Sequence, residues 1–249
     1  MIYFLILAAT GFIAGAMNAA AGGGSFVTFP VLVFLGLPAL SANVSSTVAM
    51  WPAALASAWA YRNDFRAFGP VPLKPLFIVS VIGGGVGALL LLYTPAAAFD
   101  RIVPWLLLAA TLAFVFGREA GLALRRYVHI GPVAVLVVQF VLAIYGGYFG
   151  GAVGILMMAA WSLMSEANLK VMGPTRTVVV AGANTTAVAL FLFSGQVWWI
   201  ETAVMIAGAV IGGFAGAHGA RRLSHQHIRM GVIVLSVVMT AAFFARRWL

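Results

Sequence analysis

Long apolar runs without a charged residue are the feature that most limits how this chain can fold. Pro75–Tyr93 and Pro132–Tyr148 are two such runs, and each is close to the ~20 residues that a helix needs to cross a bilayer. Only 8% of the 249 residues are charged, against about 25% in a soluble domain. Polar side chains this scarce cannot cover a water-soluble globule. A soluble enzyme, a nucleic-acid module and a disordered chain are therefore excluded.

The apolar runs lack the alternation of a membrane barrel, so the sequence predicts an all-α polytopic membrane protein. At about 20 residues per crossing, the chain has room for eight to ten membrane segments and none for a soluble domain. The net charge of +9 comes from basic residues between the apolar runs, where they set topology by staying cytoplasmic. The predicted long helices are Ile2–Met17, Ser41–Tyr61, Pro75–Tyr93, Ile102–Phe116, Pro132–Tyr148, Thr175–Phe193, Val197–Ala217 and Met230–Phe244.

The two halves of the chain carry matching glycine patterns. Ile82–Ala88 and Ile211–Ala217 share the pattern IGGxxGA and lie 129 residues apart. The spacing of Gly15 and Gly22 recurs 132 residues later. Two offsets this similar indicate duplication. The predicted domains are a first transmembrane repeat at 1–117, a polar linker loop at 118–131 and a second transmembrane repeat at 132–249.

The basic residues favour an inverted arrangement of the two homologous repeats. With inverted repeats, ten Lys and Arg residues lie on one side and three on the other, leaving out Arg176, whereas parallel repeats give eight and five. The positive-inside rule favours the more uneven split. Inversion requires the short pieces Ser25–Leu35 and Gly154–Leu163 to count as crossings completed by broken backbone, since eleven helical residues reach only about 16 Å. Whether these pieces cross or re-enter stays open.

The glycine run Gly22, Gly23 and Gly24 is predicted to break its helix, because three successive glycines disfavour helix strongly. Unwound backbone at membrane depth is tolerated only where protein or a water-filled cavity satisfies it. A half-helix beginning near Ser25 would aim free N–H groups at the gap and favour an anion. The IGGxxGA glycines are instead expected to allow close helix packing. These are Gly83, Gly84, Gly87, Gly212, Gly213 and Gly216.

Arg176 follows Pro174 at the expected start of an apolar helix. An intramembrane guanidinium is a functional hypothesis by default and would bind a carboxylate, sulfonate or sulfite through two hydrogen bonds. The alternative is that it snorkels to the interface. Uncharged polar side chains near both breaks can also ligate an oxyanion, although capping and interhelical bonding are commoner roles. The candidates among them are Asn43, Ser46, Thr47, Thr177 and Asn184.

Other chemistry has little support in the sequence. The chain has no cysteine, which excludes thiolate metal sites and thiol catalysis. The histidines lack metal-ligand spacing, and no carboxylate pair or Ser/His/Asp arrangement is visible, so we expect no catalytic residues, no metal and no cofactor. The acidic residues all lie near segment ends, which disfavours a proton relay on a buried carboxylate.

The order of these motifs resembles the sulfite exporter TauE/SafE family. Gly11–Phe26 is similar to its GxxxGxxxGxGGG opening, and Gly36-Leu37-Pro38 with Ala42–Thr47 resembles the next segment of the family pattern. Leu190–Gly195, the IGGxxGA helices and Asp100–Leu107 also look like this family. Two departures concern the site. In many members the second-repeat run is closer to A-N-x-x-K-N, and here Gly173, Arg176 and Thr177 stand where the first Asn, the Lys and the second Asn would be. In the first repeat, Asn18 stands where a glycine is usual.

The resemblance implies a multi-pass permease of the bacterial inner membrane that moves sulfite, an organosulfonate or another small sulfur oxyanion. Together with the paired breaks, it predicts an exporter in which one repeat rocks against the other around a midplane anion site. A passive anion channel and a non-transporting accessory subunit remain as alternatives. The expected partners are the anion and membrane lipids, without nucleic acid; a homodimer, the direction of transport and the coupling ion stay open.

Overall fold

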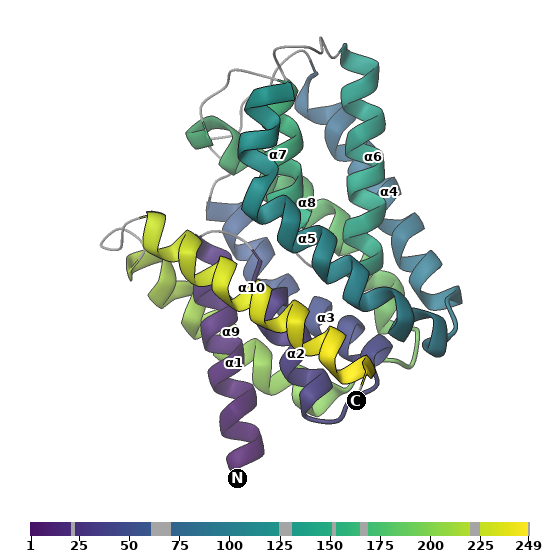
Figure 1. Ribbon diagram of the computed structural model, residues 1–249, viewed down its shortest axis with the longest axis vertical. Coiled ribbons are helices and arrows are strands. Elements are labelled where there is room, and N and C mark those ends of the chain that lie inside the picture. The colour runs from purple at the N-terminus through teal and green to yellow at the C-terminus, as the bar shows by residue number, and fades with distance from the viewer. Residues whose placement is uncertain are drawn as a thin grey trace.

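The computed structural model describes residues 1–20, 23–60, 71–124, 131–150, 153–164, 169–219 and 225–248. Within these ranges the regular structure consists of ten helices, as predicted for an all-α chain (Figure 1). They are α1 (Ile2–Ala20), α2 (Ser25–Phe34), α3 (Ala39–Ala60), α4 (Leu73–Tyr93), α5 (Ala96–Leu124), α6 (Pro132–Phe149), α7 (Val153–Met164), α8 (Leu169–Leu192), α9 (Trp199–Gly219) and α10 (His225–Trp248).

Several predicted helix boundaries are wrong because the apolar limits of a segment are not the limits of its helix. α5 begins at Ala96 and α10 at His225, six and five residues before the predicted starts. α5 extends to Leu124, so the first half of the predicted linker loop is helical, consistent with its content of Arg, Glu, Ala and Leu. α8 begins at Leu169 and contains Pro174 in its interior, a position that neighbouring helices can support. α3 begins at Ala39, so Asn43 lies inside the helix and not at its start.

Glycines bring two helix pairs into backbone contact. In the α1–α9 pair, a Cβ on Gly15 would overlap the backbone of Ala209, and in the α4–α6 pair a Cβ on Gly147 would overlap Gly84. Contacts this close are available only to glycine. The prediction that the IGGxxGA glycines pack helices is confirmed for Gly83, Gly84, Gly87 and Gly212.

The last five helices repeat the packing of the first five. α1 packs on α9 as α6 packs on α4, and α2 packs on α1 and α3 as α7 packs on α6 and α8. The counterparts α3 and α8 also pack on each other, in opposite directions. Trp51 of α3 donates from Nε1 to Thr185 Oγ1 of α8 over 2.9 Å, while the backbone N–H of Trp198, beyond the end of α8, donates to Ser45 Oγ over 3.0 Å.

α5 and α10 form a second antiparallel pair of counterparts and run side by side in Figure 1. The hydroxyls of Thr111 and Thr240 are 3.0 Å apart, and the rings of Trp105 and Phe244 meet edge to face with centroids 5.4 Å apart. Thr111 and Thr240 are separated by 129 residues, the offset that relates the two IGGxxGA runs. Residues related by this offset therefore contact each other where α5 packs on α10.

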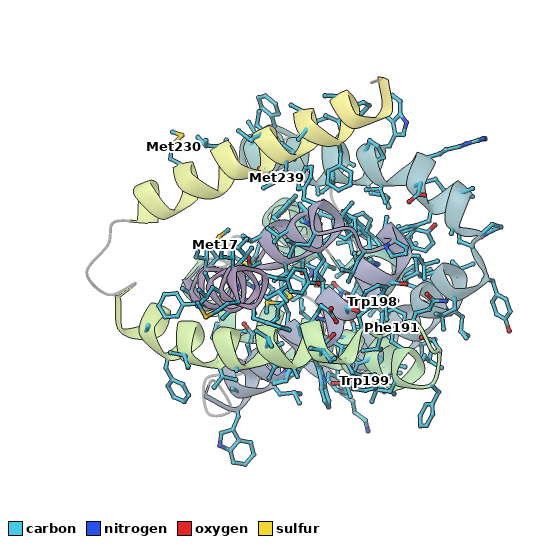
Figure 2. The ribbon with its side chains drawn as sticks, turned by 90° about the horizontal axis from the view of Figure 1, so that it is seen from below. Met17, Phe191, Trp198, Trp199, Met230 and Met239 are labelled. Atoms are coloured by element: carbon cyan, nitrogen blue, oxygen red, sulfur yellow. The ribbon has the colours of Figure 1, made fainter. Side chains whose placement is uncertain are left out.

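The outer surface of the helices is apolar. Val133 of α6 is 74% exposed and Phe193 just after α8 is 91% exposed. Figure 2 shows Met230 pointing away from the bundle and Met239 pointing toward it, both from α10. An apolar surface of this extent suits contact with lipid and not with water.

Four helices of the described chain are long and apolar enough to cross a bilayer. α2 and α7, with 10 and 12 residues, are shorter than the ~20 residues of a full crossing. The predicted eight to ten membrane segments stay a prediction. The qualifying spans are Leu73–Tyr93, Ala96–Ala113, Pro132–Phe149 and Gly173–Leu192.

Candidate functional site

The first break separates α1 from α2 at the predicted glycine run. Gly23 has a φ of +96°, a conformation that side chains other than glycine rarely adopt. Gly24 caps α2, and a Cβ on it would lie 2.6 Å from the Ala14 carbonyl oxygen and 3.1 Å from Met50 Sδ. Gly22 lies outside the described residues. The predicted interruption is confirmed at Gly23 and Gly24, with Ser25 as the first residue of α2.

The second break separates α6 from α7 and begins at Gly150, which has a φ of +70°. A left-handed glycine directly after the last helical residue is a common helix ending. A Cβ on Gly150 would lie 2.9 Å from Thr47 Oγ1. The sequence predicts a break that covers Gly146, Gly147, Gly150, Gly151 and Gly154. Gly146 and Gly147 instead belong to α6 and Gly154 belongs to α7, and Gly151 lies outside the described residues.

α3 supplies the polar side chains at the second break. Asn43 Nδ2 donates to the Tyr148 backbone oxygen over 3.0 Å, which satisfies a carbonyl of the last turn of α6. One turn further along α3, Thr47 Oγ1 donates to the Asn43 backbone oxygen over 2.9 Å and faces Gly150. Asn43 and Thr47 are both buried, so these groups lie inside the protein and not at its lipid surface.

The same stretch of α3 contacts the first break. The buried hydroxyls of Ser46 and Thr28 are hydrogen-bonded over 2.5 Å. Thr28 Oγ1 also reaches the Gly24 backbone oxygen over 3.4 Å, and Met50 Sδ lies against Gly24. Both breaks therefore pack on two adjacent turns of α3, between Asn43 and Met50.

Arg176 lies at the other end of the second break, on α8. Its side chain is half-buried and runs past Gly154 in the first turn of α7, where an added Cβ would lie 3.4 Å from Arg176 Cδ. The predicted reason for its importance, a helix start after Pro174, is wrong because Pro174 is inside α8. Its candidacy rests on its place beside Gly154. The adjacent Thr177 donates from Oγ1 to the Gly173 backbone oxygen over 3.0 Å.

Asn184 is placed differently from the other candidates. It lies in the second half of α8, between Ala183, whose backbone contacts Gly84, and Thr185, which accepts from Trp51. Its Oδ1 atom is buried and has no hydrogen-bond partner among the residues that the structure describes. Buried polar atoms are nearly always paired, so this carboxamide is available to a ligand or a water molecule.

Sequence reasoning missed Thr28 and Tyr148. Thr28 lies in an apolar run, but it follows Gly24 by four residues, a spacing at which a hydroxyl bonds the preceding turn's carbonyl. Tyr148 contributes through its backbone oxygen, which no sequence pattern marks.

A cavity of about 480 Å³ opens where α3 and α5 begin and where α4 and α8 end. Its lining contains hydroxyl and carboxamide groups but no charged side chain. The lining residues are Pro38, Leu40, Ser41, Leu89, Leu92, Tyr93, Thr94, Ala96, Ser194 and Gln196.

Comparison with known proteins decides the family. The model of the sulfite exporter TauE/SafE family matches residues 7–243. This chain belongs to the TauE/SafE family. The resemblance inferred from the sequence is therefore confirmed, and the apolar surface is consistent with a membrane transporter.

Curated relatives of this TauE/SafE protein are described as transporters. It is 32% identical over 241 residues to a probable membrane transporter protein of Haemophilus influenzae, covering 95% of this chain and 92% of the relative. It is 27% identical to the probable membrane transporter protein ORF9 of Sinorhizobium, with coverage of 98% and 93%. It is 26% identical to the probable membrane transporter protein YfcA of Escherichia coli K12, with coverage of 92% and 85%. No solved structure is significantly similar.

Proposed function

We propose that this protein is a bacterial inner-membrane exporter of a small sulfur oxyanion, such as sulfite or an organosulfonate, and is not an enzyme. The observation that carries the proposal is the convergence of both helix breaks on Asn43–Met50 of α3. Paired, glycine-interrupted helices are where transporters bind solutes. The bacterial sources of the relatives support the inner membrane.

The donors around the breaks suit an oxyanion. The starts of α2 and α7 carry the positive ends of their helix dipoles. The hydroxyls of Ser46 and Thr47 can rotate toward a ligand. Arg176, beside Gly154, supplies a positive charge and a planar pair of donors. In this proposal the anion lies at the second break, between Thr47 on α3 and Arg176 on α8.

The directions of the counterpart helices support inverted repeats. α3 runs antiparallel to α8, and α5 runs antiparallel to α10. Counterparts related by a two-fold axis in the membrane plane must run in opposite directions, whereas an axis along the membrane normal would leave them parallel. With such an axis between the two breaks, a rocking motion exposes the site to each side in turn.

The experiment is uptake of labelled sulfite, taurine and sulfoacetate into proteoliposomes, comparing the wild type with Arg176→Gln. We expect saturable uptake of one anion and a loss of at least about tenfold in the variant, because one charged hydrogen bond contributes about 1.5–3 kcal/mol. Arg101→Gln, at the exposed start of α5, is the matched control and should transport normally.

Each other outcome removes a specific part of the proposal. Flux that rises linearly with concentration would identify a passive channel. Equal uptake by Arg176→Gln and the wild type would exclude Arg176 from the site. No uptake of any of the three anions by the wild type would overturn the proposed substrate class.

A further inference from the structure

The cavity of about 480 Å³ lies at one end of the bundle, and the basic residues identify which end. The cavity is lined by the start of α3 and lies at the ends of α4 and α8. At the opposite ends of these helices, Arg62 follows α3 in the sequence, and Lys74 and Lys170 are the second residues of α4 and α8. Because basic residues flank the cytoplasmic ends of membrane helices, the cavity opens on the external side.

Two side-chain hydrogen bonds involve residues that line this cavity. Ser41 Oγ at the start of α3 donates to Gln196 Oε1 beyond the end of α8, over 2.8 Å. The Tyr148 hydroxyl at the end of α6 donates to Thr94 Oγ1 at the end of α4, over 3.3 Å. Ser41, Thr94 and Gln196 line the cavity, whereas Tyr148 is hydrogen-bonded to Thr94 and is not one of the lining residues.

The second of these bonds leads directly to the second break. Tyr148, which holds Thr94 through its hydroxyl, accepts a hydrogen bond from Asn43 on its backbone oxygen. Asn43 in turn accepts from Thr47, which faces Gly150. Tyr148 therefore contacts the cavity lining through its hydroxyl and the second break through its backbone oxygen.

Resting on the proposed function, we propose that this cavity is the external vestibule of the transport pathway and that the Ser41–Gln196 and Tyr148–Thr94 pairs form its gate. The pairs join the ends of four helices, so both must separate before an anion can pass between Gly150 and the outside. Neutral hydroxyl and carboxamide donors bind an anion more weakly than a guanidinium does, so the anion can leave the vestibule after it leaves the site.

The vestibule is tested by thiol accessibility, which requires no transport. The chain has no cysteine, so Ser41→Cys and Gln196→Cys each give a single thiol in an otherwise native protein. The matched control is Ser57→Cys, toward the opposite end of α3. With a membrane-impermeant thiol reagent added to intact cells after the outer membrane is permeabilised, we expect Ser41→Cys and Gln196→Cys to be labelled. Ser57→Cys should be labelled only when the inner membrane is also opened. The reverse pattern would overturn the external assignment.

The gate is tested with the double variant Ser41→Cys/Gln196→Cys in proteoliposomes. A bifunctional methanethiosulfonate reagent, which spans more than a direct disulfide can, should link the two positions and reduce uptake at least tenfold, and a reductant should restore it. The control pair is Tyr3→Cys/Glu201→Cys, because Tyr3 and Glu201 are hydrogen-bonded over 3.0 Å between α1 and α9, away from the cavity; cross-linking there with the same reagent should leave uptake unchanged. Undiminished uptake by fully cross-linked Ser41→Cys/Gln196→Cys protein would overturn the gate. Absence of uptake by the wild type would instead count against the proposed function, while the labelling pattern still decides the vestibule.

Discussion

Each of the two helix breaks contains a glycine with a positive φ, Gly23 in the first and Gly150 in the second, but the side chains packed against them differ. Counterpart positions on α3 and α8 lie 130 residues apart, so Thr47 corresponds to Thr177, and each donates its hydroxyl to the carbonyl four residues earlier. At the adjacent pair of positions, α3 has Ser46, bonded to the Thr28 hydroxyl, and α8 has Arg176, which lies beside Gly154. The hydroxyl bond within the helix is thus common to α3 and α8, while the positive charge lies beside the second break alone among these positions.

The largest expected effect comes from a bulky side chain at Gly150, in the second break. Gly150→Val places a β-branched side chain at a φ of +70° and within 2.9 Å of Thr47 Oγ1. Such strain costs about 1–3 kcal/mol before any clash is counted, so we expect a large fall in melting temperature in detergent and no measurable transport. Gly131→Ala, where an added Cβ meets no atom within 4 Å, should melt like the wild type. An equally stable Gly150→Val protein would show that the break is not needed for the fold.

Arg176→Lys tests whether the charge of Arg176 or the geometry of its donors distinguishes the second break. Lysine keeps the positive charge but loses the planar pair of donors. We therefore expect an uptake rate between those of the wild type and Arg176→Gln. The defect should appear as a raised apparent KM for the anion. Concentration-dependent uptake measures this. If Arg176→Lys were as impaired as Arg176→Gln, geometry and not charge would distinguish the second break.

Asn43→Ala tests the contact that α3 makes with the end of α6. The substitution leaves the Tyr148 backbone oxygen without its partner, at a cost of about 1–3 kcal/mol. We expect a lower melting temperature together with reduced transport. The counterpart position is Gly173, whose added Cβ meets nothing within 4 Å, so Gly173→Ala should change neither measurement and serves as the control.

The smallest expected effect is a difference between variants of Thr47 and Thr177, which make the same hydrogen bond. Thr47→Val and Thr177→Val remove the same hydrogen bond to the preceding turn, so their stabilities should change equally. If the anion binds at the second break, only Thr47→Val should also raise the apparent KM, by about two- to tenfold for one hydrogen bond of roughly 0.5–1.5 kcal/mol. Equal KM values for the two variants would place the anion away from Thr47.

The sequence predicted those features that depend on local composition. Glycine triplets and IGGxxGA patterns act through their missing Cβ atoms, so the first break and the close helix pairs could be located in advance. The helix start at Leu169 could not, because Lys170 and Pro174, which favour a helix boundary in the sequence, lie inside α8. The site contacts were inaccessible for a different reason: Asn43 bonds a backbone oxygen 105 residues away, a pairing that only the fold creates.

The glycine contact between α1 and α9 has a consequence for how the protein is made. Its two partners are separated by almost the whole chain, since α1 ends at Ala20 and α9 begins at Trp199. At a synthesis rate of about 5–20 residues per second, the nascent α1 waits roughly 10–40 seconds in the membrane for its partner. α4 and α6, which are separated by α5 alone, wait only a fraction of that time. Of these two glycine pairs, α4–α6 can therefore form first, and the glycine face of α1 stays without its partner until α9 has been synthesised.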